Sequence, residues 1–382
     1  MSGTAAERYL ELGLQLDRHV DGIVDSYFGP PELATRVKAA APADPRRLVG
    51  DADSLLDDLD DGWLHDQVVG VRTFAGVLAG EAVPYADEVE RCYGVRPTFT
   101  DEAMFAAAHE ELEGLLPGDG QLSERYERWR RSTEVPADRI ESVVSDIVDV
   151  GRAWTSERLD LPAGESVRVE SVRDKPWVAY CRYLGEFRSA ISVNLDLPYS
   201  AFETLQLTFH ETYPGHHAER CLKDELLART RGLLEETIVL LPTAQSLIAE
   251  GIATLAPELV LESRGEEAVA VVGGELDLES ALAVERARRP LSWVAVNAAL
   301  LLYERGESPE AVQEYIERWG LVASEMAAHQ IRFLQDPTSR SYVLTYAAGR
   351  ELCRDYVARD PARFRRLLTE QVRVGELLAG AA

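Results

Sequence analysis

Apolar residues recur at helical spacing along most of the chain. Between residues 5 and 28 this spacing predicts an opening helix, which the Gly-Pro-Pro sequence at 29–31 ends. From 48 to 160 the same periodicity continues in segments that prolines separate. The first part of the chain is therefore expected to form a helical scaffold.

The pattern changes near residue 166, where β-branched and aromatic residues become frequent and partly alternate with polar ones. Residues 166–172 and 177–198 are expected to contain two or three strands. Helical spacing returns after Pro198, and Ser200 with Glu203 three residues later has the spacing of a capping box. A helix that begins at Ser200 should therefore follow a small sheet directly.

More helices are expected in the remainder of the chain, because the helical periodicity continues between breakers. They are predicted at 222–238, 243–262, 276–304, 309–334 and 338–358, with a last helix opening at the sequence DPARF. The fold class is thus mainly α, a multi-helix fold with a small β-sheet. We expect residues 1–160 to form an N-terminal scaffold half and residues 161–382 a C-terminal half of one compact structural unit, because no flexible linker divides them.

Charge and hydropathy narrow the range of partners. The chain has 66 acidic and 40 basic residues, a formal net charge of −26, which opposes binding to nucleic acid and to anionic membranes. The longest apolar stretch, 293–303, is short of the roughly 20 residues that cross a membrane. Charged residues near the N-terminus leave no room for an export signal. We expect a cytoplasmic protein without nucleic acid or membrane as partner, and its oligomeric state stays open.

The candidate chemistry is concentrated in the sequence HETYPGHH at residues 210–217, which holds three of the seven histidines. In the HExxH zinc motif, two histidines four residues apart share one helical face, and the glutamate between them activates a water molecule. Here Pro214 stands four residues after His210. The departure requires a different backbone path if a second histidine is to reach the same ion.

Pro214 and Gly215 supply that path. In a regular helix His216 would point about 120° away from His210. Proline cannot donate the helical hydrogen bond and clashes with the preceding turn, so the helix must open, and glycine adds backbone freedom beside it. We therefore expect His216 to swing back toward His210, and prefer it to His217, which stays the alternate ligand.

A catalytic zinc site with three protein ligands needs one more side chain. Glu250 is the best candidate, because it lies in the apolar stretch SLIAEGIATLA, where an unpaired carboxylate would be costly to bury. An arginine partner for Glu250 is the competing interpretation. Glu219 and Glu258 are weaker alternatives as ligands.

Five ordered motifs resemble the bacterial "domain of unknown function 885" family: SVNLDLP, HETYPGHHAE, AEGIA, IRFLQDP and SYVLTYAAG, within about residues 185–352. That family is similar to gluzincin zinc metallopeptidases. The resemblance implies a gluzincin-like fold, one Zn²⁺ per chain, the ligands His210, His216 and Glu250, and Glu211 as general base. Ile252 departs from the family pattern, in which an aromatic residue usually follows Glu-Gly, and leaves substrate preference open.

A metallopeptidase that hydrolyses short peptides is the leading functional hypothesis. Tyr346, in a family-like Tyr-x-x-Gly unit, is the first candidate to stabilise the oxyanion, with Tyr342 behind it. Arg332 could pair with a substrate carboxylate, and Asn194 could hold substrate backbone beside a strand edge.

Three other interpretations remain. The protein could hydrolyse a different amide or an ester, or it could hold the metal without turnover, with His217 closing the fourth coordination position. It could also be a metal-free helical protein.

Overall fold

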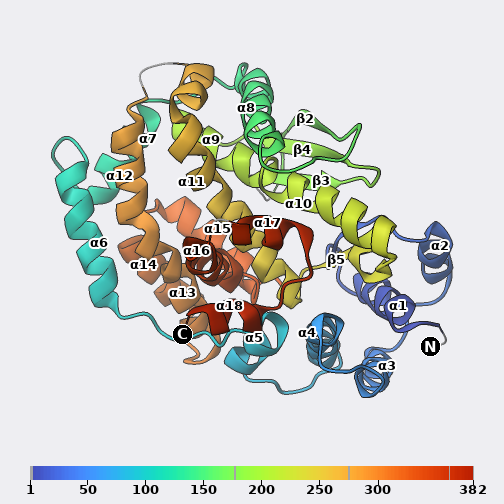
Figure 1. Ribbon diagram of the computed structural model, residues 1–382. Coiled ribbons are helices and arrows are strands. Elements are labelled where there is room, and N and C mark those ends of the chain that lie inside the picture. The colour runs from blue at the N-terminus through green and yellow to red at the C-terminus, as the bar shows by residue number, and fades with distance from the viewer. Residues whose placement is uncertain (1–2, 176–177, 274–275, 361, 382) are drawn as a thin grey trace.

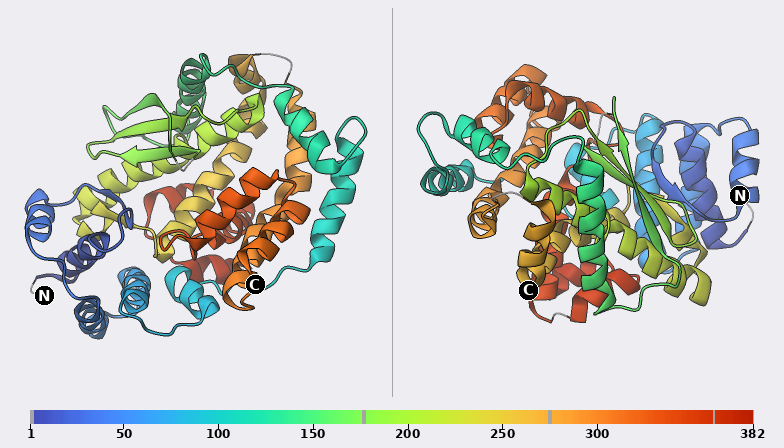
Figure 2. Two further views of the ribbon diagram at one scale, coloured as in Figure 1. Left: turned by 180° about the vertical axis from the view of Figure 1, so that it is seen from behind. Right: turned by 90° about the horizontal axis from the view of Figure 1, so that it is seen from above.

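The computed structural model of the protein describes residues 3–175, 178–273, 276–360 and 362–381. Helices make up 65% of it and strands 8%, which confirms the prediction of a mainly α fold. In Figure 1 the three-stranded sheet lies at one side of the molecule, next to helices α8 and α10. The two views of Figure 2 show α1–α3 and the pair α6–α7 at opposite ends of the molecule.

Some helices before the sheet begin with a proline, as α2 does at Pro31. Some follow a capping residue, such as Asp44 before α3. They are α1 (Ala5–Asp17), α2 (Pro31–Ala39), α3 (Pro45–Asp57), α4 (Trp63–Leu78), α5 (Tyr85–Tyr93), α6 (Glu102–Leu115), α7 (Leu122–Arg131) and α8 (Ile140–Ser156).

The predicted opening helix is wrong after Asp17. Val24–Tyr27 forms strand β1, which pairs antiparallel with β5 (Ile238–Leu240). The partner lies more than 200 residues away in the sequence, so local periodicity could not indicate this strand. Its position matters because β1 brings an acidic residue to the candidate site.

The predicted small sheet is confirmed. It consists of β2 (Ser166–Val172), β3 (Ala179–Tyr183) and β4 (Arg188–Asn194), in the order β2-β4-β3. Strand β4 pairs parallel with β2 and antiparallel with β3, which leaves β3 at an edge. Residues 176–177, at the start of the second predicted stretch, lie outside the described residues.

The helices after the sheet include one long helix, α11. They are α9 (Ala201–Glu211), α10 (His216–Lys223), α11 (Ala244–Val272), α12 (Leu278–Arg288), α13 (Trp293–Tyr303), α14 (Pro309–Gly320), α15 (Ser324–Gln335), α16 (Arg350–Ala358), α17 (Ala362–Thr369) and α18 (Val374–Ala381).

Several predicted helices are shorter than expected. The helix predicted at 222–238 instead begins at His216 and ends in a π-helical turn, Asp224–Arg229, before β5. The predicted helix 276–304 is broken at Arg289–Ser292, which contains Pro290. The predicted helix 309–334 divides where Leu321 adopts a left-handed conformation.

The region 338–358 also differs from the prediction. It begins with turns and a π-helical segment, Thr345–Gly349, and is α-helical only from Arg350. The C-terminal helix expected from DPARF is present as α17, although Pro361 lies outside the described residues.

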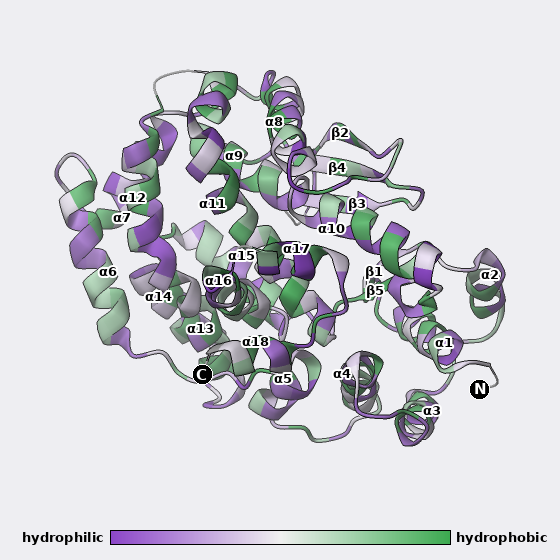
Figure 3. Ribbon diagram, in the orientation of Figure 1, coloured by the Kyte–Doolittle hydropathy of each residue, from purple (hydrophilic) through white to green (hydrophobic). Residues whose placement is uncertain are grey.

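Packing joins the two predicted halves. The main hydrophobic core runs from α5 to α18, and α8 packs on α9 and α11. A second core lies among α1–α4 and β5, and a third joins α6 and α7 to α12–α14. Figure 3 shows peripheral helices such as α6 with both hydrophobic and hydrophilic residues, as expected for helices with one face in solvent.

Helix α11 is the central element of the main core. By length and composition it could cross a membrane, but 83% of its most apolar 18-residue window is buried inside the protein. Burial between α8, α9 and α16 accounts for its apolar character. This helix carries Glu250 into the interior.

Candidate metal centre

Helix α9 brings the first two residues of the motif to the site. The hydroxyl of Ser200 accepts a hydrogen bond from the backbone N–H of Glu203, and the Glu203 side chain accepts one from the backbone of Ser200. This is the predicted capping box. The helix ends at Glu211, so His210 and Glu211 occupy its last turn.

The chain turns sharply after α9. The Tyr213–Pro214 peptide bond is cis, and α10 begins at His216. A methyl group at Gly215 would lie 1.9 Å from the carbonyl oxygen of His210 and 2.6 Å from that of Phe209. Because backbone atoms cannot move aside as a flexible side chain can, only glycine fits this position. The turn folds back on the end of α9 and sets the His216 ring 4.8 Å from the His210 ring, between centroids.

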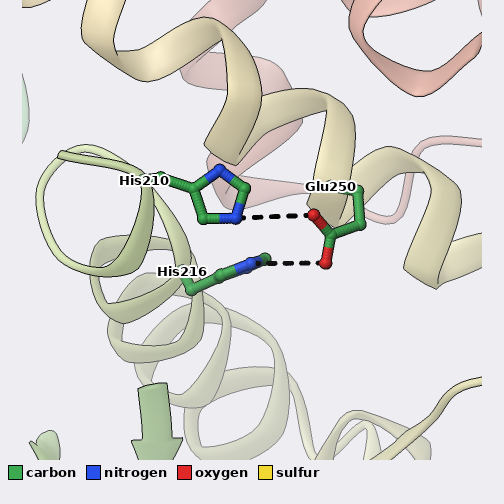
Figure 4. Close-up of side chains that lie close together, drawn as sticks. All are labelled: His210, His216 and Glu250. Atoms are coloured by element: carbon green, nitrogen blue, oxygen red, sulfur yellow. Dashed lines mark ion pairs between the residues drawn. The ribbon is translucent and has the colours of Figure 1, made fainter. Parts of the chain in front are cut away.

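Glu250 approaches the two histidines from α11. Its Oε2 lies 3.5 Å from Nε2 of His210, and its Oε1 lies 3.5 Å from Nε2 of His216. Figure 4 shows the three side chains converging from α9, α10 and α11. One donor atom from each of them lies within 4.8 Å of the others.

These distances fit a zinc ion better than they fit hydrogen bonds. Tetrahedral zinc with bonds of about 2.1 Å holds its ligand atoms roughly 3.4 Å apart, whereas N–H···O hydrogen bonds span about 2.7–3.2 Å. Oε2 of Glu250, the oxygen that faces His210, is buried and has no hydrogen-bond partner among the described residues. Two imidazoles and one carboxylate form a donor set typical of catalytic zinc.

In the metal-free protein the histidines and Glu250 shift the pKa values of one another. Burial alone would raise the pKa of Glu250, but His216 and His210 outweigh it and lower the pKa to about 2. Burial would likewise lower the pKa of His216, but Glu250 raises it to about 9. Burial lowers the pKa of His210 to about 4. His216 and Glu250 thus stabilise the charged forms of each other.

Glu211 lies beside this cluster on the wall of a cavity of about 370 Å³. Burial raises the pKa of its carboxyl group to about 7, although the nearby His216 opposes the shift. A carboxyl group with a pKa near neutrality can both accept and donate a proton under physiological conditions. The same cavity is lined by His210, His216 and Glu250.

The two predicted tyrosines also line the cavity, but in different situations. The hydroxyl of Tyr342 donates a 2.6 Å hydrogen bond to Oε1 of Glu250, so this residue orients a candidate ligand. Tyr346 is 40% exposed and makes no hydrogen bond to the described residues. Gly251 and Gly349 allow this arrangement: a methyl group at Gly251 would lie 2.4 Å from the carbonyl oxygen of Gly349.

The structure does not place Asn194 and Arg332 at the cavity. Asn194 belongs to the central strand β4, where its side chain donates to the carbonyl of Lys175 and accepts from the backbone of Asp196. Arg332 is exposed on α15 and approaches His329 at 3.5 Å. Neither residue lines the cavity, because its neighbours in the fold hold it elsewhere, and contact of these two residues with substrate stays a prediction.

His217 points away from the cluster. Its Nδ1 lies 2.7 Å from the hydroxyl of Ser189, and its Nε2 lies 3.2 Å from Oε2 of Glu165. Glu165 also binds Tyr213 and Arg152. His217 therefore helps to hold the turn of the motif and does not occupy a fourth ligand position.

The alternative carboxylates are engaged elsewhere. Glu219 accepts a 2.7 Å hydrogen bond from Lys223, and Glu258 pairs with Arg289 and Arg350 at 2.7 Å each. A second group of potential ligands, Asp61, His65 and Asp66, is partly exposed, and Arg373 pairs with both of its carboxylates. Within the described parts of the chain, the cluster around Glu250 is the stronger candidate.

Sequence reasoning missed two charged residues that line the cavity, Asp25 on β1 and Arg220 on α10. Arg220 follows His216 by four residues, so helical periodicity could have placed both on one face. No such signal existed for Asp25, because its strand was predicted as helix.

Fold and site together define a mainly helical protein with a two-histidine, one-carboxylate candidate metal centre. No family model matches the sequence, and a sequence comparison with curated proteins found no match. The resemblance to the "domain of unknown function 885" family therefore stays a prediction.

Solved structures share the fold. A protein from Colwellia psychrerythraea, described as a presumed lipoprotein, aligns with a TM-score of 0.58 at 15% identity, over 92% of this chain and 69% of that one. A protein of unknown function from Shewanella oneidensis, also described as a presumed lipoprotein, aligns with a TM-score of 0.54 at 11% identity, over 98% of this chain and 72% of that one. At these identities the likeness concerns the fold alone.

Proposed function

We propose that this protein is a zinc-dependent metallopeptidase that hydrolyses short peptides. One observation carries the proposal: donor atoms of His210, His216 and Glu250 converge within 4.8 Å at the wall of a cavity that Glu211 also lines. Membership of a gluzincin-like family is part of this proposal.

The residues divide the chemistry between them. His210, His216 and Glu250 would hold one Zn²⁺, which supplies a Lewis acid that activates water and polarises a carbonyl group. Glu211 takes a proton from the attacking water at its carboxylate and returns it to the nitrogen of the leaving amine. Its position on the cavity wall beside the candidate ligands suits both steps.

The tyrosines have separate roles in this mechanism. Tyr342 orients Glu250 through its hydrogen bond, as an outer-shell partner of a metal ligand does. Tyr346, whose hydroxyl is free of hydrogen bonds to the described residues, donates to the oxyanion that forms at the substrate carbonyl. The supporting observation is the position of both residues on the cavity wall.

The cavity favours small substrates. Its volume of about 370 Å³ is at the lower end of the range for small-molecule pockets, roughly 300–1,000 Å³. Apolar side chains such as Val24, Val239 and Phe333 line it beside the polar groups. A short peptide fits such a space, whereas a folded protein does not.

The cellular location is part of the test. The sequence predicts a cytoplasmic protein, whereas both structural neighbours are described as presumed lipoproteins. Fractionation of host cells followed by immunoblotting separates the two locations.

Elemental analysis and peptide hydrolysis test the function. Protein purified without chelator should contain about one zinc per chain, and His210→Ala prepared identically should contain none. Glu211→Gln should keep the zinc but lose about 10²–10⁴-fold in activity toward a mixed peptide library, because it removes a general base and not a ligand.

Other outcomes point to the competing functions. Turnover of esters or non-peptide amides without turnover of peptides would indicate a different hydrolase. Zinc without turnover of any of them would indicate a metal-binding protein, and absence of metal after zinc is offered would refute the site.

A further inference from the structure

Arg220 has the features of a binding residue that lacks its ligand. It lies on α10, is only 7% exposed and lines the cavity beside His216. Among the described residues it has no hydrogen-bond partner, and no carboxylate lies within 4.0 Å of its guanidinium. Its guanidinium nitrogens are not among the fully buried polar atoms without a partner, so they open onto the cavity, where their five N–H donors suit an anion.

The acidic residues nearest to Arg220 do not meet this need. Glu219, Asp25 and Glu236 act on it electrostatically and oppose the effect of burial on its pKa. Glu219, however, is paired with Lys223 at 2.7 Å, and Glu236 accepts a 2.9 Å hydrogen bond from Gln371. These charges offset the cost of burying the guanidinium but leave its planar fork unused.

Asp25 shares the cavity wall with Arg220 without forming an ion pair with it. Burial raises the pKa of Asp25, and the positive charge of Arg220 is the largest electrostatic influence that lowers it. Both residues line one cavity, so a ligand in that cavity can reach the guanidinium of Arg220. A planar carboxylate matches a guanidinium through two parallel hydrogen bonds.

We propose that Arg220 binds the C-terminal carboxylate of the substrate, so that the enzyme removes one residue from the end of a short peptide. The proposal rests on the metallopeptidase function and adds its substrate class: peptides with a free carboxylate. Arg220 follows His216 by one helical turn, about 6 Å, and a single extended residue spans about 3.5 Å. This spacing suits a carboxylate on the residue just after the scissile bond.

The bond changes are those of simple hydrolysis. The oxygen of water bonds to the carbonyl carbon, and the C–N bond of the last peptide link breaks. The amine nitrogen gains a proton through Glu211, and one free amino acid leaves with its carboxylate still paired with Arg220.

The first experiment compares two forms of one library of short peptides, with a free or an amidated C-terminus. The wild type should prefer the free form. Arg220→Gln should lower kcat/KM for the free form by about 30-fold or more, because a buried charge partner is lost, and should affect the amidated form far less. Arg220→Lys should restore part of the loss through its charge, without the bidentate geometry.

Arg332→Gln is the matched control, since it removes an exposed arginine outside the cavity and should change neither rate. Each variant must keep the zinc content and the thermal midpoint of the wild type. If Arg220→Gln fails to fold, the test is whether Arg220→Lys has a lower kcat/KM than the wild type for peptides with a free C-terminus. Equal hydrolysis of free and amidated peptides, with Arg220→Lys equal to the wild type, would overturn the proposal while the metallopeptidase function stands.

A binding measurement keeps the proposal testable even without turnover. Titration calorimetry of zinc-loaded protein with N-acetyl-alanine should show binding that Arg220→Gln weakens and Arg332→Gln does not. N-acetyl-alaninamide should bind the wild type more weakly than N-acetyl-alanine does. Its affinity should be the same for the wild type, Arg220→Gln and Arg332→Gln. Such binding without any peptide hydrolysis would support Arg220 as a carboxylate site and refute the proposed function. Equal binding of acid and amide would refute the role of Arg220.

Discussion

Replacement of Tyr342 by phenylalanine tests how Glu250 is held in the candidate metal centre. The Tyr342 hydroxyl donates a 2.6 Å hydrogen bond to Oε1 of Glu250, the same oxygen that lies 3.5 Å from Nε2 of His216. The other oxygen has no hydrogen-bond partner among the described residues. The substitution therefore removes the hydrogen bond that orients the carboxylate.

The expected magnitude follows from this geometry. A hydrogen bond to a charged group contributes about 1.5–3 kcal/mol, and loss of an outer-shell partner of a metal ligand typically costs about 10–100-fold in affinity. A factor of ten corresponds to about 1.4 kcal/mol, so the two ranges agree. We expect Tyr342→Phe to bind zinc about 10–100-fold more weakly than the wild type.

Zinc affinity is measured by competition with a chromophoric chelator at fixed pH and salt. Tyr346→Phe is the matched control, because its ring lies 5.6 Å from the Tyr342 ring but its hydroxyl does not contact Glu250. It should bind zinc like the wild type. Its peptide turnover should fall instead, because it loses the donor assigned to the oxyanion.

Two results would refute this reasoning. Unchanged zinc affinity in Tyr342→Phe would show that Glu250 is oriented without the hydrogen bond. Weaker zinc binding in Tyr346→Phe than in Tyr342→Phe would show that the two tyrosines have been assigned the wrong roles.

The remaining predictions concern the turn, a buried ion pair and the metal. Gly215→Ala should destabilise the fold by about 1–3 kcal/mol or more and abolish zinc binding, because its methyl group would lie 1.9 Å from the His210 carbonyl oxygen. Gly50→Ala, at an exposed position of α3 where the methyl group would meet nothing within 4 Å, should not destabilise it; equal thermal midpoints for both variants would contradict the argument. Glu219→Gln should cost about 3 kcal/mol at pH 7 in chelator-treated protein, because it leaves Lys223 buried without its partner. Lys223 and Arg220 outweigh burial and lower the folded pKa of Glu219, so the stabilisation is present above the unfolded pKa of about 4.3 and is lost as pH falls through the folded value. The difference between the two proteins in urea denaturation should shrink below about pH 4, and a constant difference would exclude this cause. Removal of zinc should lower the free energy of unfolding by about 2.7 kcal/mol when free zinc had been 100 times its Kd, and an unchanged thermal midpoint would argue against a bound metal.

The sequence alone determined the features that depend on neighbours within one or two helical turns. The capping box of Ser200 and Glu203 and the strands of the small sheet follow from local pattern, and the structure contains them. The motif at 210–217 and the carboxylate of Glu250 were recognisable because a charge in an apolar helix and histidines around a Pro-Gly break are unusual.

Only the tertiary structure decided which charged groups share the cavity. Sequence reasoning expected an arginine for a substrate carboxylate and chose Arg332, whereas the fold turns Arg220 into the cavity and leaves Arg332 in solvent. It also predicted that Asp25 lies in a helix, although this residue lies in strand β1, whose partner β5 is more than 200 residues away in the sequence. Helical periodicity and capping act over three or four residues and are visible in the sequence. Strand pairing, and the choice of which buried charges face each other, depend on contacts between distant segments that exist only after the chain has folded.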